Sequence, residues 1–223
     1  MANEDVAFPF VDFNGDLIEF FGSNPSGQPL TVIVNSIANS LYMRYCFRVL
    51  NPKMEAKTFK SNVRLMTYGD DNVMSVNPTT PWFNHTAIAS TLEAVGIGYT
   101  MADKDAESVP YIPFEDVTFL KRKFVYDKDI DAIVCPIDED SIHKVLTMGV
   151  VSRDVSREKQ AADVLQSVVR EYFWYGRSSF EMHRDMMMKI AVKSGIEDWM
   201  DPFPTWEDLK IAFDEASARR QFC

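Results

Sequence analysis

Residues that hold metals or cross-link chains are scarce in this sequence. Its three cysteines, Cys46, Cys135 and Cys223, lie far apart and form no Cys-x-x-Cys pair, and its three histidines are equally scattered. This pattern argues against a zinc site or a disulfide framework and favours reduced thiols in an intracellular compartment. We also find no signal peptide and no apolar run long enough to cross a bilayer. We therefore expect a globular protein, and the hydrophobic content of 46% is ordinary for that class.

Positive charge is in deficit overall but concentrated locally. The chain has 23 Lys and Arg against 33 Asp and Glu, a net charge of −10. Residues 40–64 hold six cations against the single carboxylate of Glu55, a local charge of +5. Lys121-Arg122-Lys123 forms a second basic cluster. A nucleic-acid backbone responds to the local field, so such a partner stays open beside the alternative of a solvated basic helix end. The cations of the first cluster are Arg44, Arg48, Lys53, Lys57, Lys60 and Arg64.

The strongest local signals are two hairpins with a long helix between them. Asn14-Gly15 lies between apolar-rich runs in residues 8–21, and Gly69-Asp70 lies between strand-like runs in residues 63–76. A helix from about Leu30 to Leu50 should end at Asn51-Pro52. Its broad apolar face is predicted from residues that recur every four positions, with a second apolar row beside them. The first row is Ile33, Ile37, Leu41, Tyr45 and Val49, and the second is Val34, Ala38, Tyr42 and Cys46.

The rest of the chain changes from mixed to helical patterning. Residues 85–95 predict a helix that ends at Gly96, residues 97–100 a short strand, and residues 116–126 a hairpin with basic residues near its bend. From about Asp127 onward we expect helices at 141–149, 156–172, 178–194 and 206–220. The expected fold class is therefore α+β, with residues 1–126 mixed and residues 127–223 mostly helical.

Two adjacent carboxylates, Asp70 and Asp71, lie at the tip of the second predicted hairpin. Carboxylates placed side by side repel each other, and a divalent cation such as Mg²⁺, which prefers oxygen ligands, would remove that penalty. A solvated acidic turn explains the same residues equally well. The flanking sequence must decide between these interpretations.

Four motifs follow one another in the order and spacing of a known family. They are Ser26-Gly27-x3-Thr31-x3-Asn35, Tyr68-Gly69-Asp70-Asp71, Ala102-Asp103-Lys104 and Phe119-Leu120-Lys121-Arg122. They resemble motifs B, C, D and E of the picorna-like viral RNA-dependent RNA polymerases. Residues 22–31 look most similar to the polymerases of dicistrovirus-like and marine picorna-like viruses. Four such motifs in order are far more specific than any one of them.

The resemblance implies a right-hand polymerase. Residues 1–126 would be part of the palm, an RRM-like antiparallel sheet with helices, and residues 127–223 the helical thumb. The implied activity is RNA-directed RNA polymerisation, a two-metal ribonucleotidyl transfer that replicates a positive-strand RNA virus genome. The implied cofactor is Mg²⁺ or Mn²⁺. The implied partners are template and primer RNA, ribonucleoside triphosphates, and the N-terminal fingers and palm portion of the same polymerase. The expected location is the host cell cytoplasm, at viral replication complexes.

The resemblance also implies a role for each matching residue. Asp70 and Asp71 would bind the metal ions, and Lys104 would protonate the pyrophosphate as a general acid. Thr31 and Asn35 match positions that help to select a ribose 2′-hydroxyl, while Ser26 and Gly27 match a flexible loop that adjusts to the nucleotide. The primer grip would be formed by Phe119, Leu120, Lys121 and Arg122.

Two parts of the family pattern are absent from this sequence. We find no Asp-x4-Asp strand upstream of Ser26, where these polymerases carry motif A, and no basic fingers motif. We therefore expect a polymerase fragment, inactive by itself, whose sheet under Asp70 has an unpaired edge. An inactive remnant or an RNA-binding module is the alternative. A reverse transcriptase is a third hypothesis, and the Thr31 and Asn35 pair argues against it.

Overall fold

The computed structural model describes residues 10–19, 30–149 and 152–220. The chain divides into two compact units, Met1–Ile112 and Pro113–Cys223, and each is described by itself. The hairpin at residues 116–126 falls in the second unit by its contacts. The palm and thumb boundary at residue 126 is a functional division, and it stays a prediction.

The first hairpin forms as predicted. Strands β1 (Phe10–Phe13) and β2 (Asp16–Glu19) pair antiparallel, and Phe13 lies opposite Asp16. The two turn residues, Asn14 and Gly15, both have positive φ (55° and 96°), as a type I′ hairpin turn requires. The Gly15 N–H donates to Asp12 Oδ1 at 2.8 Å, which closes the turn.

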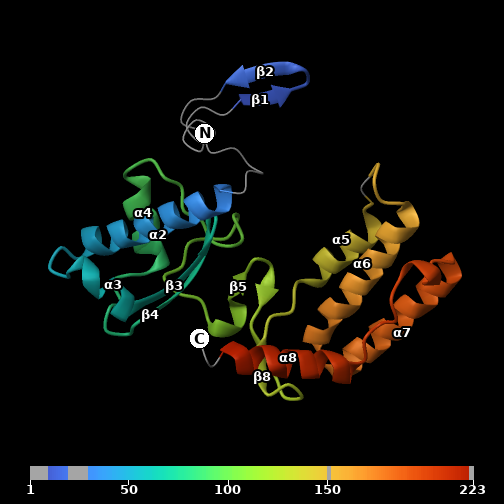
Figure 1. Ribbon diagram of the computed structural model, residues 1–223. Coiled ribbons are helices and arrows are strands. Elements are labelled where there is room, and N and C mark those ends of the chain that lie inside the picture. Colours follow the sequence, from blue (N-terminus) through green and yellow to red (C-terminus); the bar gives the residue numbers. More distant parts are fainter. Residues whose placement is uncertain (1–9, 20–29, 150–151, 221–223) are drawn as a thin grey trace. The chain divides into compact units, whose positions relative to one another are not determined.

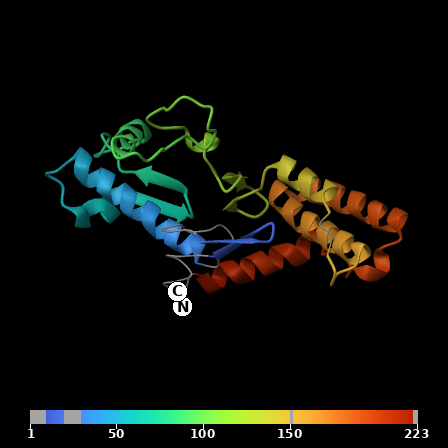
Figure 2. The same ribbon diagram turned by 90° about the horizontal axis from the view of Figure 1, so that it is seen from above.

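The rest of the first unit packs two helices against a hairpin (Figures 1 and 2). Helix α2 (Thr31–Leu50) contacts the antiparallel strands β3 (Val63–Tyr68) and β4 (Asp71–Val76) and also helix α4 (His85–Glu93). The 3₁₀ turn η1 (Ala56–Thr58) and helix α3 (Phe59–Asn62) link α2 to β3. Within the described residues the sheet has two strands, so β3–β4 has the unpaired edges expected from the sequence. The buried core consists of Met43, Cys46, Phe47, Phe59, Val63, Phe83, Ile88 and Leu92.

Helix α2 matches its predicted bounds, but of its predicted apolar face only Cys46 is buried. Its buried residues are Asn39, Met43, Cys46 and Phe47. The first row of the predicted apolar face is solvent-exposed, with Ile37 57% and Leu41 59% accessible. The face was predicted wrongly because periodicity finds an apolar stripe but does not say which partner covers it. Burial raises the pKa of the Cys46 thiol to about 11, so this cysteine is a neutral core residue.

Helix α4 begins at its predicted residue, His85, and ends at Glu93, two residues before the predicted end. The Asn84 side chain caps it by accepting from the Ala87 N–H at 3.1 Å, and Gly96 follows with φ of 79°. The strand predicted at residues 97–100 is wrong. The Ile97 N–H donates to Leu92 O at 3.0 Å, so this segment bonds back to the helix end instead of joining a sheet.

The second unit begins with short strands and 3₁₀ turns and continues as a helical bundle (Figure 1). The predicted hairpin at 116–126 is shorter than expected, with β5 (Thr118–Phe119) pairing with β6 (Arg122–Lys123). Strands β7 (Val125–Asp127) and β8 (Ala132–Val134) form a further pair. The helices are α5 (Glu139–Thr147), α6 (Arg157–Tyr172), α7 (Arg177–Ser194) and α8 (Trp206–Arg220). The 3₁₀ turns are η2 (Phe114–Asp116), η3 (Phe173–Tyr175) and η4 (Glu197–Trp199).

Two helices of the second unit are capped by Ser156 and Gly195, and the helices share one core. Ser156 Oγ accepts from the Lys159 N–H at 3.2 Å, and Gly195 ends α7 with φ of 64°. Tyr172 and Phe173, at the junction of α6 and η3, are 2% exposed and stack against aromatic rings of neighbouring elements. No described helix combines the length and apolarity of a membrane span.

Candidate active site

Two exposed carboxylates lie at the tip of the β3–β4 hairpin. Tyr68 pairs with Asp71, so Gly69 and Asp70 alone form the turn. Gly69 is buried and has φ of 64°, which the first central position of a tight hairpin turn requires. Asp70 and Asp71 are both solvent-exposed. The turn therefore displays its carboxylates while its backbone faces the protein.

Helix α2 holds this turn through two polar side chains. The amide of Asn39 donates to the backbone carbonyls of Asp70 at 2.7 Å, Asp71 at 3.2 Å and Gly69 at 3.4 Å. The Ser36 hydroxyl donates to Val32 O at 2.6 Å and accepts from the Gly69 N–H at 2.8 Å. Asn39 is 6% exposed, so these bonds are formed away from solvent, where they are worth more.

The polar network continues across the hairpin. The Asn72 amide donates to Asn39 Oδ1 at 2.9 Å, and Asn72 Oδ1 accepts from the Tyr99 hydroxyl at 2.9 Å. Burial raises the pKa of Tyr99, so the phenol stays protonated and can donate. The Tyr99 ring stacks on His85 at 4.8 Å between centroids. The turn is thus held from α2 on one side and from the α4 region on the other.

Ser36, Asn39 and Asn72 hold the turn but belong to none of the four motifs. Their hydrogen bonds join residues about 30 positions apart, which no local pattern reveals. One signal was present, because Thr31, Asn35 and Asn39 recur every four residues and form a polar stripe along the helix. A buried amide at such a position must find partners, and here they are the turn carbonyls.

Gly69→Ala should lower the free energy of unfolding by about 1–2 kcal/mol, because the left-handed backbone conformation is less favourable by that amount for an L-amino acid with a Cβ atom. The added Cβ would lie 3.7 Å from Val32 Cγ2, which is ordinary contact, so backbone strain and not a clash is the expected cause. Chemical denaturation measures the loss. The control is Gly98→Ala, where φ is not in the left-handed region and nothing lies within 4 Å of the added Cβ. Equal effects at both glycines would contradict the interpretation.

The residues present fit a hard divalent cation in part. Two adjacent carboxylates supply the oxygen ligands that Mg²⁺ prefers. The backbone carbonyls of the same two residues are bound by the Asn39 amide, which holds the turn away from their side chains. Among the described residues, no group of three or more His, Cys, Asp and Glu side chains could hold a metal ion. Asp70 and Asp71 would therefore need further oxygen ligands from water, from substrate phosphates or from another part of the polymerase.

The other residues assigned from motifs B and D are placed as follows. Thr31 and Asn35 lie in the first turns of α2, half-buried, on the same helix as Ser36 and Asn39. Lys104 is exposed in a turn that the Ala106 N–H closes on Asp103 O at 3.1 Å. Ser26 and Gly27 lie outside the described residues. The roles assigned to these residues stay predictions.

The predicted primer-grip residues occupy the β5–β6 hairpin of the second unit. Leu120 and Lys121 form its turn with φ of 52° and 60°, a conformation that costs energy for residues other than glycine. Lys121 is exposed, and Phe119 is half-buried. Arg122 is engaged inside the unit, because its guanidinium forms a bidentate pair with Glu171 at 2.8 and 3.0 Å and donates to Cys135 O at 2.8 Å. The hydrogen bond to Glu171 raises the pKa of Arg122.

Arg122→Met should lower the free energy of unfolding by about 1–2 kcal/mol, because it leaves Glu171 and the Cys135 carbonyl without their partner. The pair is about one-third exposed, so the loss should be smaller than for a fully buried ion pair. Lys121→Met is the matched control, with the same charge change at an exposed site and an expected change within about 0.5 kcal/mol. Denaturant titration of both variants tests this, and an unchanged stability in Arg122→Met would refute a structural role.

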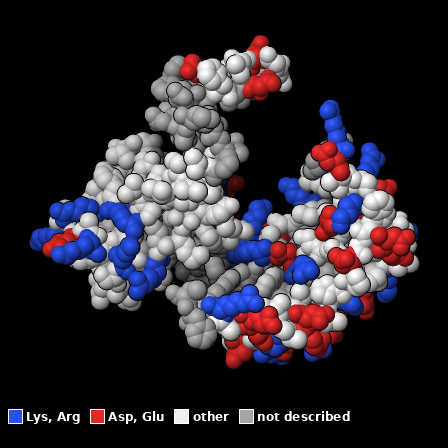
Figure 3. Space-filling model, viewed as in Figure 1, with Lys and Arg blue, Asp and Glu red and all other residues white. Residues whose placement is uncertain are grey.

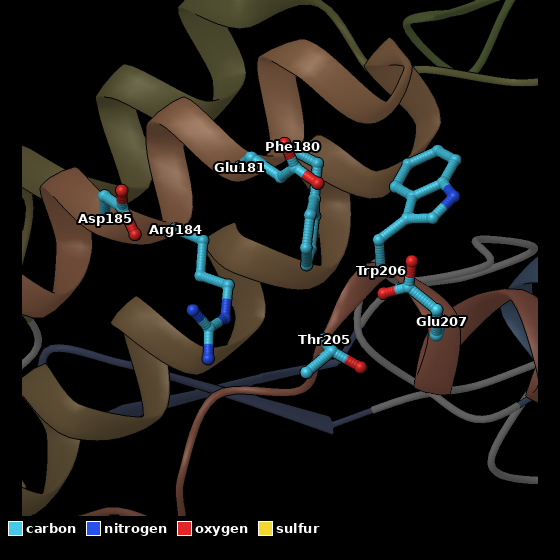
Figure 4. A pocket seen from close by; sticks show the side chains of 7 residues that line it. All are labelled: Phe180, Glu181, Arg184, Asp185, Thr205, Trp206 and Glu207. Atoms are coloured by element: carbon cyan, nitrogen blue, oxygen red, sulfur yellow. The ribbon is translucent and has the colours of Figure 1, made fainter.

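The second unit also contains a cavity of about 340 Å³ between α7 and the start of α8 (Figure 4). Three of its charged lining residues, Glu181, Arg184 and Glu207, are already engaged. Arg177 bridges Glu181 at 2.9 Å and Glu207 at 2.6 Å, and Arg184 donates to the carbonyls of Phe203 and Pro204. These contacts join α7 to α8, so the cavity has a structural explanation. Its lining residues are Phe180, Glu181, Arg184, Asp185, Thr205, Trp206 and Glu207.

The chain was compared with known families and with curated proteins. The family model of viral RNA-dependent RNA polymerases matches residues 1–164. The replicase polyprotein of Cricket paralysis virus is 29% identical over 77% of this chain and 10% of its own length. The RNA1 polyprotein of Grapevine chrome mosaic virus is 41% identical over 55% of this chain and 6% of its own length. The RNA1 polyprotein of Andean potato mottle virus is 32% identical over 76% of this chain and 26% of its own length.

A comparison with solved structures supports the fold. A Sicinivirus 3Dpol RNA-dependent RNA polymerase superposes with a TM-score of 0.70 at 23% identity. The match covers 94% of this chain and 41% of that polymerase. The chain thus spans less than half of the solved enzyme and about a tenth or less of most of the polyproteins it resembles. The family match over residues 1–164, together with these relatives, places the chain in the viral RNA-dependent RNA polymerase family of picorna-like viruses.

Proposed function

We propose that this chain supplies the motif C carboxylates and the thumb of an RNA-directed RNA polymerase that replicates a positive-strand RNA virus genome. The observation that carries the proposal is the Gly69–Asp70 turn, which displays Asp70 and Asp71 while Asn39 binds three of its carbonyls. Rigid presentation of two oxygen ligands is what metal-assisted phosphoryl chemistry needs. The substrates are a primed RNA template and ribonucleoside triphosphates.

Asp70 and Asp71 are the residues of this chain that would hold Mg²⁺ or Mn²⁺. When bound, the ions lower the pKa of the primer 3′-hydroxyl and stabilise the leaving pyrophosphate. The primer 3′-hydroxyl would give its proton to water and its oxygen would form a bond to the α-phosphorus of the nucleotide, while the bond from that phosphorus to the pyrophosphate oxygen breaks. Lys104 gives a proton to the pyrophosphate, a role suited to an exposed and normally protonated amine.

The remaining residues bind and orient in this proposal. Thr31 and Asn35 hydrogen-bond the ribose 2′-hydroxyl, since a hydroxyl and an amide can both donate and accept. Ser26 and Gly27 form the loop that adjusts to the nucleotide. Phe119, Leu120 and Lys121 contact the primer strand, with the Lys121 ammonium on a phosphate, whereas Arg122 supports their hairpin through Glu171.

The exposed stripe of α2 and the open edges of β3–β4 would pack against the N-terminal fingers and palm portion of the same polymerase. Ile33, Ile37 and Leu41 are each more than half exposed, and a patch of this kind marks an interaction surface. That portion would also provide the further carboxylate that the metal site requires. The proposed location of the assembled enzyme is the viral replication complex in the host cytoplasm.

Primer extension by the polymerase that contains this chain tests the proposed function. We expect template-directed incorporation of ribonucleotides that stops on chelation of divalent cations and returns with Mg²⁺ or Mn²⁺. Preference for deoxynucleotides would instead indicate a reverse transcriptase. RNA binding without any incorporation by the complete protein would favour the RNA-binding module and contradict the proposal.

A further inference from the structure

Exposed cations gather at one end of the first unit, on a surface to which motifs B, C and D assign no role. They lie on the last turns of α2, on the η1–α3 segment and at the start of β3 (Figure 3). The only carboxylate in this stretch, Glu55, is paired with Lys57 at 2.6 Å and is itself 65% exposed. We call this surface the α2–β3 basic patch, and its members are Arg48, Lys53, Lys57, Lys60 and Arg64.

The basic patch is built on a fixed scaffold. Phe59 lies beneath it, is 2% exposed and makes edge contacts with Phe47 and Phe83 in the core. Arg48 donates to the carbonyls of Pro52 and Met54 and so ties the loop to the end of α2. These contacts hold the segment in place, so its cations are presented at fixed spacing and do not belong to a flexible tail.

Two ammonium groups of the patch are available to a ligand. Lys53 and Lys60 are exposed and form no ion pair with the described residues. Arg64 donates one N–H to Lys60 O at 2.7 Å and keeps its other donors for a partner. In a chain of net charge −10, such a concentration of cations creates a local positive field that opposes the overall charge.

The patch is separate from the catalytic turn. Asn39, which binds the turn, lies eleven residues before the end of α2, or about 16 Å along the helix axis. Arg64 lies five residues before Gly69 on β3, which is again about 16 Å. A nucleic acid bound at the patch therefore makes contacts additional to those at Asp70 and Asp71.

We propose that the α2–β3 basic patch binds the phosphate backbone of double-stranded RNA, without reading its sequence, as an RNA-binding surface distinct from the catalytic turn. Exposed Lys and Arg side chains at fixed spacing match the charge of a duplex backbone, and such contacts supply most of non-specific affinity. The choice of RNA over DNA rests on the proposed function.

Two other ligands fit the patch less well. A single-stranded RNA binds best to several exposed aromatic rings in a row, but Phe59 of the η1–α3 segment is buried, and Tyr45, 46% exposed, is the one aromatic side chain displayed on the last two turns of α2. A membrane surface would be favoured by several exposed apolar side chains among the cations, but Met54 is half-buried and Val63 is 3% exposed, which leaves Val49 at the end of α2, 45% exposed. The duplex is therefore the partner that the patch matches best.

The test compares two charge-matched double variants of the 223-residue chain. Lys53→Gln/Lys60→Gln removes two patch ammonium groups, and Lys189→Gln/Lys193→Gln removes two exposed ammonium groups from α7. Binding of a labelled blunt-ended RNA duplex is measured by fluorescence anisotropy, with EDTA and without nucleotides, from about 50 to about 200 mM salt. Vesicles with and without phosphatidylserine are assayed in parallel, and circular dichroism confirms that both variants fold.

The patch variant should lose about tenfold in affinity at low salt, and its salt slope should fall by about 2, one unit for each lost phosphate contact. The α7 variant should change neither quantity. Equal losses in both variants, or binding to phosphatidylserine vesicles in place of duplex RNA, would overturn the proposal. Asp70→Asn should leave this binding intact, so failure of the catalytic proposal is distinguishable from failure of this one.

Discussion

Asp70→Asn should lower the rate of nucleotide incorporation by the complete polymerase by about a thousandfold or more. Electrostatic stabilisation by a bound metal is worth several kcal/mol in a phosphoryl transfer, and each 1.36 kcal/mol is a factor of ten in rate. The amide keeps the shape of the carboxylate but has no negative charge to hold the cation. Because Asp70 is exposed and its backbone carbonyl stays bound to Asn39, the fold should not change.

Asp71→Asn should cost less, about tenfold to a hundredfold, since the resemblance to motif C assigns it the assisting role. Glu93→Gln is the control, because it removes one exposed carboxylate from the end of α4 in the same unit. Single-turnover primer extension at several Mg²⁺ concentrations measures all three variants, and thermal melts confirm equal folding. Activity in Asp70→Asn within a factor of ten of the unmodified enzyme would refute the assignment.

What could be predicted from the sequence is what short-range chemistry determines. The two tight hairpins, the bounds of α2 and the Ser156 and Gly195 caps follow from the residues at those positions. The Gly69–Asp70 turn could be placed because glycine accepts positive φ at a position where the flanking runs already require a turn. The turn at Leu120 and Lys121 carries no glycine, and its left-handed backbone could not be foreseen.

The other features that could not be predicted depend on which partner a segment finds in the folded chain. Ile97–Thr100 has strand-like residues, but a strand needs an edge to pair with, and the segment bonds to the end of α4 instead. The sequence predicts the apolar stripe of α2, but whether that stripe faces the core depends on which other elements pack beside the helix. Arg122 was assigned to the primer grip by the resemblance to motif E, and that resemblance gave no indication of its pairing with Glu171, 49 residues away.

Asn39→Leu should reduce the turnover number by about tenfold to a hundredfold, although Asn39 touches neither metal nor substrate in the proposed mechanism. The substitution keeps the approximate size of the side chain but removes the donor shared by three turn carbonyls. Leaving buried acceptors without a donor costs about 1–3 kcal/mol, so the turn should relax toward solvent. A displacement of a catalytic group by about 1 Å can cost a hundredfold in rate.

A merely structural role for Asn39 would lower stability and leave the metal dependence unchanged. If Asn39 positions the carboxylates, the Mg²⁺ concentration for half-maximal activity should rise severalfold, while the KM for the ribonucleotide changes little. Asn62→Leu is the matched control, since that half-buried amide donates to Thr58 O at 2.9 Å in the same unit, at the opposite end of β3 from the turn. It should lose stability with no shift in Mg²⁺ dependence. Identical Mg²⁺ profiles for the two variants would show that Asn39 supports the fold alone, and that the carboxylates are aligned by other contacts.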